Sequence, residues 1–366
     1  MPRQRILFIT PLPPPVHGSA MVSQYIKENK ELNEDFICDF VNLSTSRNID
    51  EIGKKSIMKY LRFIGAYFIT FWKLLTHRYA LCYLAITCYG IGFLKDAPFV
   101  LLCKLFRRKV IIHQHNKGMS SCVDKNPYKW LLPLVYRNTK VILLSWHLYQ
   151  DIEQVVKKEQ IIICPNGIPD ISGNEPLIER NNKTPHLLFL SNLIPSKGVY
   201  TLLDACKVLK EKGYNFVCDF VGGESKEITR SIFEKVVEER GLNNIAIYHG
   251  PKYGNDKILH FVNANIFVQP TSNDCFPLTL LEAMQYQLPI ITTNIGGIPD
   301  IVINDNNGYI CECNNVTALA KAIEKLISNR EKAVEMGQNG YRLFNEKFTL
   351  EQFNKNIIQI IKDNIQ

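Results

Sequence analysis

One stretch, from residue 264 to residue 302, constrains the fold of this chain more than any other. It begins with the apolar run Ala264 to Val268, which is short, rich in residues that favour sheet and followed by a proline, so it predicts a buried strand. Leu278 to Gln287 predicts a helix, Pro289 to Thr293 the next strand, and Gly296-Gly297 the turn after it. In such a unit the helix start favours an anion, and ligands bind at the carboxyl ends of the strands.

Two acidic residues, Asp274 and Glu282, lie eight positions apart in this stretch. Asp274 stands where the loop meets the predicted helix, and Glu282 lies inside the helix. Carboxylates are natural acceptors for sugar hydroxyls, because each can accept two O–H bonds. The alternative is that Asp274 caps the helix and Glu282 is a solvated helix residue. The spacing alone leaves both interpretations open.

These residues resemble the acid-x7-Glu signature of the retaining glycosyltransferases of family 4. That signature usually begins with Glu, and here Asp274 takes its place. Glu282-Ala-Met, Pro289-Ile-Ile and Gly296-Gly297 fit the family pattern. The resemblance covers nearly the whole chain and is strongest from His186 to Val302. It implies the GT-B fold, two Rossmann-like domains facing across a cleft, and transfer of a sugar from a nucleotide sugar to an acceptor hydroxyl with retained configuration.

Composition narrows the class of protein further. With 366 residues, 46% hydrophobic and 21% charged, the chain is long enough for two well-filled domains of an ordinary globular protein. The 11 cysteines are scattered, with only Cys311 and Cys313 close together, which suits neither a zinc site nor a disulfide framework and indicates a reducing cytoplasm. No D-x-D motif occurs, so no metal cofactor is expected. The apolar run Ile6 to Thr10 is too short for a signal peptide.

The net charge of +8 is concentrated in one part of the chain. Between Arg47 and Lys140, 17 Lys and Arg stand against four acids, so this part carries more positive charge than the whole chain. Such a region suggests an anionic surface, either a membrane or a nucleic acid. It contains no recognised nucleic-acid motif, so we expect no nucleic-acid partner.

Lys54 to Leu75, within the basic region, has apolar and aromatic residues at helical spacing. Lys55, Lys59, Arg62 and Lys73 fall largely on the other side of that helix. A basic helix with an aromatic apolar face can lie in a membrane interface, and its charges prevent it from spanning the bilayer. The alternative is an ordinary helix packed on the sheet of the first domain. A membrane-facing first domain would suit a lipid-linked acceptor and salt-sensitive, peripheral attachment to the inner face of the membrane.

The first domain contributes two candidate regions. Arg5 to Thr10 predicts a strand, and the loop after it resembles the family's first glycine-rich loop, which approaches the donor diphosphate. Gly18 keeps one of the two usual glycines and Ser19 replaces the other; a plain strand–helix connection is the alternative. His115 follows the predicted strand Val110 to His113 and resembles the family's active-site histidine. A histidine just past a strand end lies on the ligand-binding edge of such a sheet.

The second domain is expected to start near His186, and its first loop holds the candidate cations. The family usually has Gly-Arg and then Lys-Gly there, whose cations bind the donor diphosphate by charge-assisted bonds. Lys197 is retained, but Asn192 stands at the arginine position. Gly222 follows the next predicted strand, at a phosphate-side turn.

The sequence therefore predicts a GT-B protein with a first domain at 1–165, a second domain at 171–348 and a last helix at 349–366 that returns to the first domain. The resemblance gives catalytic roles to His115, Asp274 and Lys197. It gives donor contacts to Gly18, Ser19, Asn192, Lys197, Gly222, Asp274, Cys275, Phe276, Pro277, Leu278, Thr279 and Glu282.

The implied activity is a glycosyltransferase of cell-surface polysaccharide or glycolipid biosynthesis. Its expected partners are a nucleotide sugar and a saccharide or lipid-linked saccharide acceptor. Two other functions remain as alternatives: a nucleotide-sugar epimerase of the same fold, and a non-catalytic membrane-peripheral protein with a degenerate fold. Measured turnover of nucleotide sugars would separate the catalytic and non-catalytic interpretations.

Overall fold

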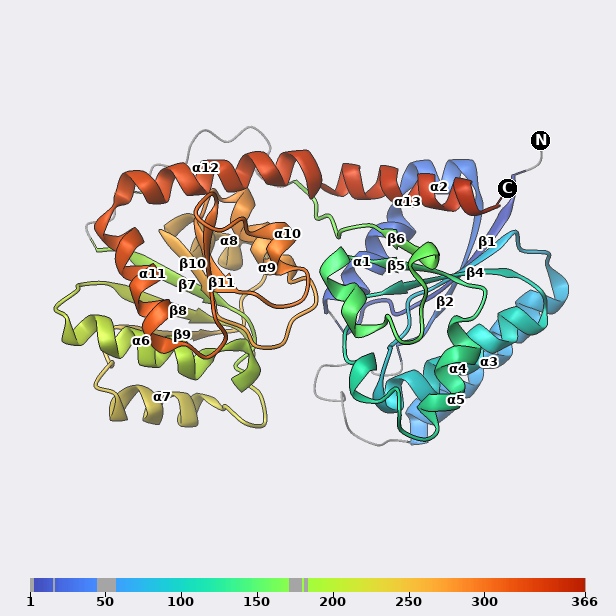
Figure 1. The fold of residues 1–366 in the computed structure, drawn as a ribbon, viewed down its shortest axis with the longest axis horizontal. Coiled ribbons are helices and arrows are strands. Elements are labelled where there is room, and N and C mark those ends of the chain that lie inside the picture. The colour runs from blue at the N-terminus through green and yellow to red at the C-terminus, as the bar shows by residue number, and fades with distance from the viewer. Residues whose placement is uncertain (1–2, 16, 45–56, 171–179, 181–183, 366) are drawn as a thin grey trace. The chain divides into compact units, whose positions relative to one another are not determined.

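The computed structural model describes residues 3–15, 17–44, 57–170, 180 and 184–365. The chain divides into two compact units (Figure 1). The first unit comprises Met1–Gly167 together with Leu350–Gln366, and the second comprises Ile168–Thr349. The first residues of the predicted second domain, 171–179, lie outside the described part of the chain.

The first unit contains a six-stranded parallel sheet in the order β2-β1-β3-β4-β5-β6. Its central strands are buried along almost their whole length, because helices cover a parallel sheet on both faces. The strands are β1 (Arg5–Thr10), β2 (Ile37–Asn42), β3 (Leu81–Leu84), β4 (Lys109–Gln114), β5 (Lys140–Leu143) and β6 (Ile161–Ile163). The helices are α1 (Gly18–Glu28), α2 (Lys30–Asp35), α3 (Ile57–Thr76), α4 (Gly90–Leu105), α5 (Tyr128–Tyr136) and α13 (Leu350–Ile365).

The second unit repeats this architecture, with a parallel sheet in the order β12-β11-β10-β7-β8-β9. The strands are β7 (His186–Leu190), β8 (Val217–Val221), β9 (Ala246–Gly250), β10 (Ile266–Gln269), β11 (Ile290–Thr293) and β12 (Gly308–Cys311). The helices are α6 (Val199–Glu211), α7 (Arg230–Glu239), α8 (Gly254–Asn263), α9 (Leu278–Gln285), α10 (Ile298–Ile301), α11 (Val316–Ser328) and α12 (Arg330–Lys347). A core of aliphatic and aromatic side chains lies between the sheet and these helices.

Each sheet has one position where the chain reverses the direction in which it adds strands. In the first unit this switch point lies between β1 and β3, and in the second it lies between β7 and β10. The loops that leave neighbouring strands on the two sides of a switch point diverge and leave a crevice at the carboxyl edge, where ligands bind in open α/β sheets. The topology therefore gives each unit one favoured ligand edge.

The last helix, α13, belongs to the first unit although it ends the chain. It packs against β3 through a buried apolar face that includes Phe353, Ile357 and Ile361. Lys362 on its exposed side pairs with Asp35 at the end of α2, with 2.7 Å between Nζ and Oδ2. The predicted fold class, including the return of the C-terminal helix, is confirmed.

Two details differ from the sequence prediction. Residues 161–168 resemble the family's linker between the two domains, but Ile161–Ile163 forms β6 at the edge of the first sheet and pairs with β5. The 18-residue helix α12 was missed, because its polar composition, including Gly337 and Gly340, gives a weak helical pattern. Gly337 allows close packing there, since a Cβ would lie 2.0 Å from the carbonyl oxygen of Gln287.

Candidate functional site

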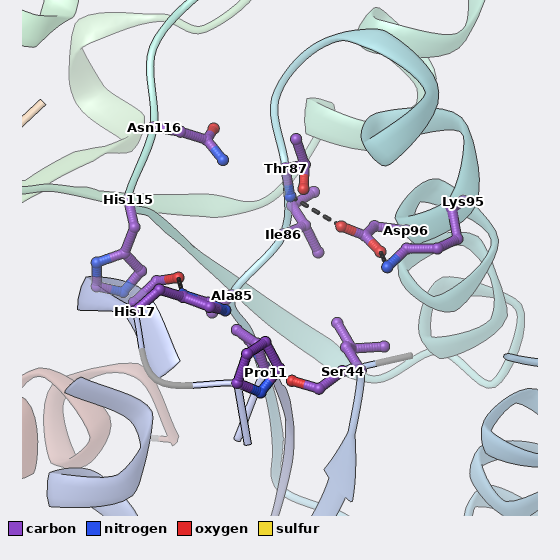
Figure 2. A pocket seen from close by; sticks show the side chains of 13 residues that line it. Pro11, His17, Ser44, Ala85, Ile86, Thr87, Lys95, Asp96, His115 and Asn116 are labelled. Carbon is purple, nitrogen blue, oxygen red and sulfur yellow. Dashed lines mark hydrogen bonds and ion pairs between the residues drawn. The ribbon is translucent and has the colours of Figure 1, made fainter. Parts of the chain in front are cut away.

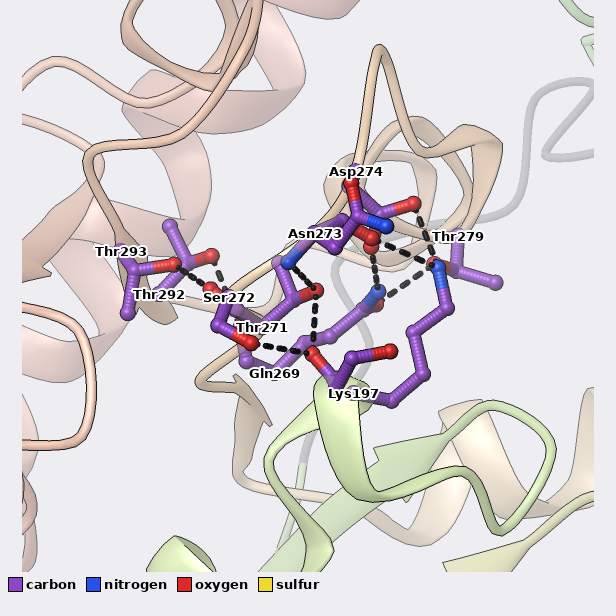
Figure 3. A network of polar contacts seen from close by, with 10 residues as sticks. Lys197, Gln269, Thr271, Ser272, Asn273, Asp274, Thr279, Thr292 and Thr293 are labelled. Atoms are coloured by element: carbon purple, nitrogen blue, oxygen red, sulfur yellow. Dashed lines mark hydrogen bonds and ion pairs between the residues drawn. The ribbon is translucent and has the colours of Figure 1, made fainter. Parts of the chain in front are cut away.

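At the switch point of the second unit, Lys197 and Asp274 form an ion pair (Figure 3). Lys197 ends the short 3-10 turn that follows β7, and Asp274 lies in the loop after β10. The Lys197 Nζ is 2.6 Å from Asp274 Oδ1 and 3.4 Å from the carbonyl oxygen of Asn273. The two side chains are only 22% and 13% exposed, so the pair is partly shielded from water. The structure thus brings together two of the three predicted catalytic residues.

Asp274 does not cap the helix that follows it. The N-cap of α9 is Pro277, and no side chain of the described residues caps that helix. The other carboxylate oxygen of Asp274 accepts a hydrogen bond of 3.2 Å from Gln269, the last residue of β10. The Thr279 hydroxyl donates to Gln269 Oε1 at 2.7 Å and so fixes the amide that orients Asp274. Gln269 was not predicted as a site residue. The sequence pattern that could have identified it is a polar residue at the end of an apolar strand.

Two glycines allow the backbone to close around this pair. Gly198, directly after Lys197, has φ +87°, and a Cβ there would lie 2.2 Å from the carbonyl oxygen of Pro270. Gly296 has φ +58°, and a Cβ would lie 2.4 Å from the carbonyl oxygen of Asp274. Both positions therefore need glycine for conformation and for space.

Glu282 has a different cationic partner from Asp274. The carboxylate of Glu282, a residue of α9, lies 2.8 Å from the ammonium of Lys257 on α8. The Glu282 side chain is 22% exposed and that of Lys257 is 29% exposed. Glu282 is therefore a paired, half-buried carboxylate, and the solvated-residue alternative is wrong. Lys257 was missed because it lies 25 positions away on a separate helix.

Asn192, at the position where an arginine was expected, binds the neighbouring backbone. Its Oδ1 accepts a hydrogen bond of 3.0 Å from the N–H of Gly223, in the turn after β8. Gly222 in the same turn has φ +155°, and a Cβ would lie 2.0 Å from the carbonyl oxygen of Ser191. The Asn192 side chain thus holds the loop after β7 to the turn after β8 by this hydrogen bond. An arginine, which has no acceptor, cannot replace this bond.

The remaining predicted donor residues lie in the loop before α9 and contribute unequally. The Cys275 carbonyl accepts a 2.7 Å hydrogen bond from the Gly297 N–H, which closes the loop. The side chain of Phe276 is 5% exposed and packs edge-on against Phe348, so it belongs to the core of the second unit. Pro277 is buried too, whereas Leu278 is half-buried.

The first unit has a pocket of about 450 Å³ at its own switch point (Figure 2). Its walls come from the loops after β1, β2, β3 and β4, so the topology accounts for its position. The volume is in the range of small-molecule sites. The polar side chains that line it are His17, Ser19, Ser44, Thr87, Lys95, Asp96, His115 and Asn116.

The predicted residues of the first loop have local roles at the start of α1. His17 is the N-cap, and its Nδ1 accepts a 3.3 Å hydrogen bond from the Ala20 N–H. The Ser19 hydroxyl lies 3.1 Å from the same nitrogen. Gly18, expected in the loop, is the first residue of α1. His17 and Ser19 line the pocket.

His115 lies directly after β4, and it lines the pocket from a half-buried position. Its ring centroid is 4.0 Å from that of His113, whose Nδ1 is hydrogen bonded to the hydroxyl of the buried Tyr83. His113 Nε2 and His115 Nδ1 are buried and have no hydrogen-bond partner within the described part of the chain. Burial, together with His17, lowers the pKa of His115 to about 3. Burial also holds the pKa of His113 well below its usual value, so both rings are neutral at neutral pH.

We expect the free energy of unfolding to fall on mild acidification. In the unfolded chain these histidines titrate near pH 6.5, but the folded pKa of His115 is about 3. The unfolded state therefore binds more protons than the folded state between these pH values. The contribution of the neutral histidines to the free energy of unfolding is fully present above about pH 6.5 and is lost progressively below it. Urea unfolding between about pH 7.5 and pH 5 should show this loss, and His115→Asn should reduce the slope. The exposed His77→Asn is the control; equal slopes in all three proteins would contradict the assignment.

Asp96, on α4, was not predicted as a pocket residue. It is 3% exposed, and its Oδ2 accepts a 2.9 Å hydrogen bond from the Thr87 N–H in the loop after β3. The Lys95 ammonium lies 3.2 Å from its Oδ1. Desolvation raises the pKa of Asp96, and Lys95 opposes that effect. One aspartate in an apolar helix forms no motif, so only the fold identifies it.

Within the residues that the structure describes, no group of three His, Cys, Asp or Glu side chains could hold a metal ion. Lys197 and Lys257 are instead the cations that face the two candidate carboxylates.

Two parallel six-stranded sheets, each with a polar site at its switch point, and a last helix that returns to the first unit define a protein of the GT-B class. Solved structures agree with this class. A glycosyltransferase from Rickettsia africae matches with a TM-score of 0.78 and 17% identity over 100% of both chains. Anabaena HepE in complex with UDP-glucose matches with a TM-score of 0.74 and 15% identity, over 99% of this chain and 100% of HepE.

Residues 174–343 match the family model described as "Glycosyl transferases group 1". For that part of the chain, the match confirms the resemblance to the group 1 glycosyltransferases. The capsular polysaccharide biosynthesis glycosyltransferase CapM of Staphylococcus aureus is 30% identical over 161 residues, which are 44% of this chain and 41% of CapM. The chain aligns with about half the length of the curated relatives that it matches.

Proposed function

We propose that this protein transfers a sugar from a nucleotide-sugar donor to an acceptor hydroxyl, in the biosynthesis of a cell-surface polysaccharide or glycolipid. The observation that carries the proposal is the Lys197–Asp274 pair at the switch point between β7 and β10. A cation beside a carboxylate at this edge suits a ligand that carries both phosphate and hydroxyl groups. CapM by its name, and HepE by its UDP-glucose complex, support the same class of reaction.

In this proposal Lys197 binds the donor diphosphate. An ammonium group has three N–H donors, and Lys197 directs two of them to Asp274 and to the Asn273 carbonyl, so one remains for a phosphate oxygen. The uncapped N-terminus of α9 and the N–H groups near Gly18 add further donors to the leaving diphosphate. Asp274 accepts from hydroxyls of the donor sugar, and Glu282 accepts from the ribose.

In the first unit, the resemblance to the family assigns a role to His115, which lines the pocket there. His115 offers a neutral ring to the donor sugar, because burial keeps it unprotonated at neutral pH. The reaction proceeds without a metal and with retained configuration, as in family 4, and the departing phosphate helps to deprotonate the acceptor. A saccharide or lipid-linked saccharide is the acceptor, and the protein works in the cytoplasm.

A screen of nucleotide sugars tests this proposal. One donor, for example a UDP-hexose, should raise the melting temperature, and adding saccharide or lipid-linked acceptors should release the nucleotide with a new α-linkage detectable by NMR. Turnover should be unchanged by EDTA. If the protein converts the donor into its epimer in the absence of an acceptor, its activity is epimerisation and the proposed transfer is wrong. Failure of every donor to bind would leave a non-catalytic protein of this fold.

A further inference from the structure

An uncharged apolar stripe runs along the exposed side of α3. Its members recur at spacings of three and four residues, so they lie on one face of the helix. Six large side chains, between 47% and 79% exposed, form this stripe: Ile57, Leu61, Ile64, Phe68, Trp72 and Leu75. Tyr60 and Phe71 border it and are also exposed. Contiguous apolar surface of this kind marks an interaction site in a folded protein.

The other side of α3 is packed, so the exposed stripe is held in place. Thr70 and Leu74 are buried, and Phe63 and Tyr67 contact Phe99 of α4 edge-on, with ring centroids 5.6 and 5.7 Å apart. Figure 1 shows α3 and α4 side by side. The packed-helix alternative is thus correct for one side of α3 only.

The basic residues of α3 do not lie on the stripe. Lys73 points to the sheet, where its ammonium lies 2.8 Å from Asp39 of β2. Lys59 and Arg62 are half-buried at positions off the stripe. Lys55, and the start of the predicted helix at Lys54, lie outside the described residues. Reversing the charges of Lys59 and Arg62 would therefore not test the apolar surface that the structure exposes.

A basic segment borders one end of the stripe. Phe71 contacts Phe106, the residue after α4, with ring centroids 5.8 Å apart. Leu105, beside it, is 76% exposed, and the chain continues as Arg107-Arg108-Lys109. Arg107 and Lys109 are exposed. Apolar side chains next to exposed cations match the boundary between acyl chains and anionic headgroups.

We propose that α3 lies in the interface of an anionic lipid bilayer, with the stripe inserted toward the acyl chains and residues 107–109 meeting the headgroups. Tyr60 and Trp72 suit the boundary between acyl chains and headgroups, because their rings combine apolar surface with a polar group. The proposed contact is with the surface of the bilayer. Among the described residues, no helix is long and apolar enough to cross a bilayer. A protein partner is less favoured, because the stripe carries no charged group to fix the orientation of a partner.

Vesicle binding tests the proposal directly and needs no substrate. The wild type should co-sediment with vesicles of phosphatidylethanolamine and phosphatidylglycerol, and Trp fluorescence should shift to the blue. Phe68→Glu with Trp72→Glu should weaken partitioning by at least about tenfold, because two large apolar side chains lose their burial. Leu259→Glu is the matched control: Leu259 is 56% exposed on α8 of the second unit, and its replacement should change nothing.

A second comparison separates the two parts of the surface. Arg107→Glu should weaken binding several-fold to vesicles with phosphatidylglycerol and leave binding to pure phosphatidylcholine unchanged. Thermal melting checks that each variant is folded. Equal partitioning of the wild type and the double variant would overturn the proposal. A dimer in light scattering that the double variant abolishes, with no vesicle binding, would make the stripe a protein interface. Neither result depends on catalysis, so the proposed transferase activity is tested separately.

Discussion

Lys197→Ala is expected to lower kcat/KM by about two to three orders of magnitude. In the proposed reaction the ammonium faces the diphosphate as negative charge develops on it, and removing one such donor costs about 3–4 kcal/mol of transition-state stabilisation. Asn192 at the usual arginine position supplies no second cation, since its Oδ1 accepts from the Gly223 N–H. Steady-state kinetics with the donor found in the screen would measure the loss.

A matched control for this variant lies in the same unit. Lys212 forms an ion pair of equal length, 2.6 Å, with Glu324. Lys212→Ala should therefore keep full activity, while Lys197→Arg should recover part of it. Wild-type turnover in Lys197→Ala would refute the role and direct attention to another cation, such as Lys257 or Lys117. Asn192→Arg adds a cation but removes the hydrogen bond from the Gly223 N–H, so it should also weaken the connection between the two loops that this bond joins.

Glu282→Gln is expected to raise the dissociation constant for the donor nucleotide by about ten- to a hundredfold. Hydrogen bonds to a charged acceptor contribute about 1.5–3 kcal/mol each, and an amide keeps the shape of the carboxylate but loses its charge. The substitution also leaves Lys257 without its 2.8 Å ion pair. Calorimetry with the bare nucleotide would measure binding without turnover.

Two further variants separate the loss of the proposed ribose contact at Glu282 from the loss of its ion pair with Lys257. Lys257→Gln removes the cation and keeps the carboxylate, so it should retain more nucleotide affinity than Glu282→Gln. Glu324→Gln, which disturbs the Lys212 pair on the other side of the unit, should bind like the wild type. Unchanged affinity in Glu282→Gln would remove the ribose assignment. A loss of melting temperature as large in Glu324→Gln as in Glu282→Gln would indicate only a general effect of breaking ion pairs.

The sequence was most informative where local pattern and topology coincide. The apolar run before Gln269, the helix that begins at Leu278 and the strand at Ile290–Thr293 were predicted within two residues. Their order already implied a parallel sheet, because strand–helix–strand units join parallel strands. The same pattern predicted that Asp274 and Lys197 lie near the ends of strands. It could not predict their 2.6 Å contact, because the two residues are 77 positions apart in the sequence.

The sequence by itself indicated the fold class, because alternating apolar strands and helices leave few topologies open. The resemblance carried by its motifs pointed to the family and to the main candidate residues. Only the tertiary structure decided which charges meet. Lys257 faces Glu282, Lys73 faces Asp39, and Asn192 binds a backbone N–H where the family has a cation. It also decided which side of α3 is exposed. Helical periodicity shows that a face is apolar, but whether that face is buried depends on the helices and strands that the rest of the chain places against it.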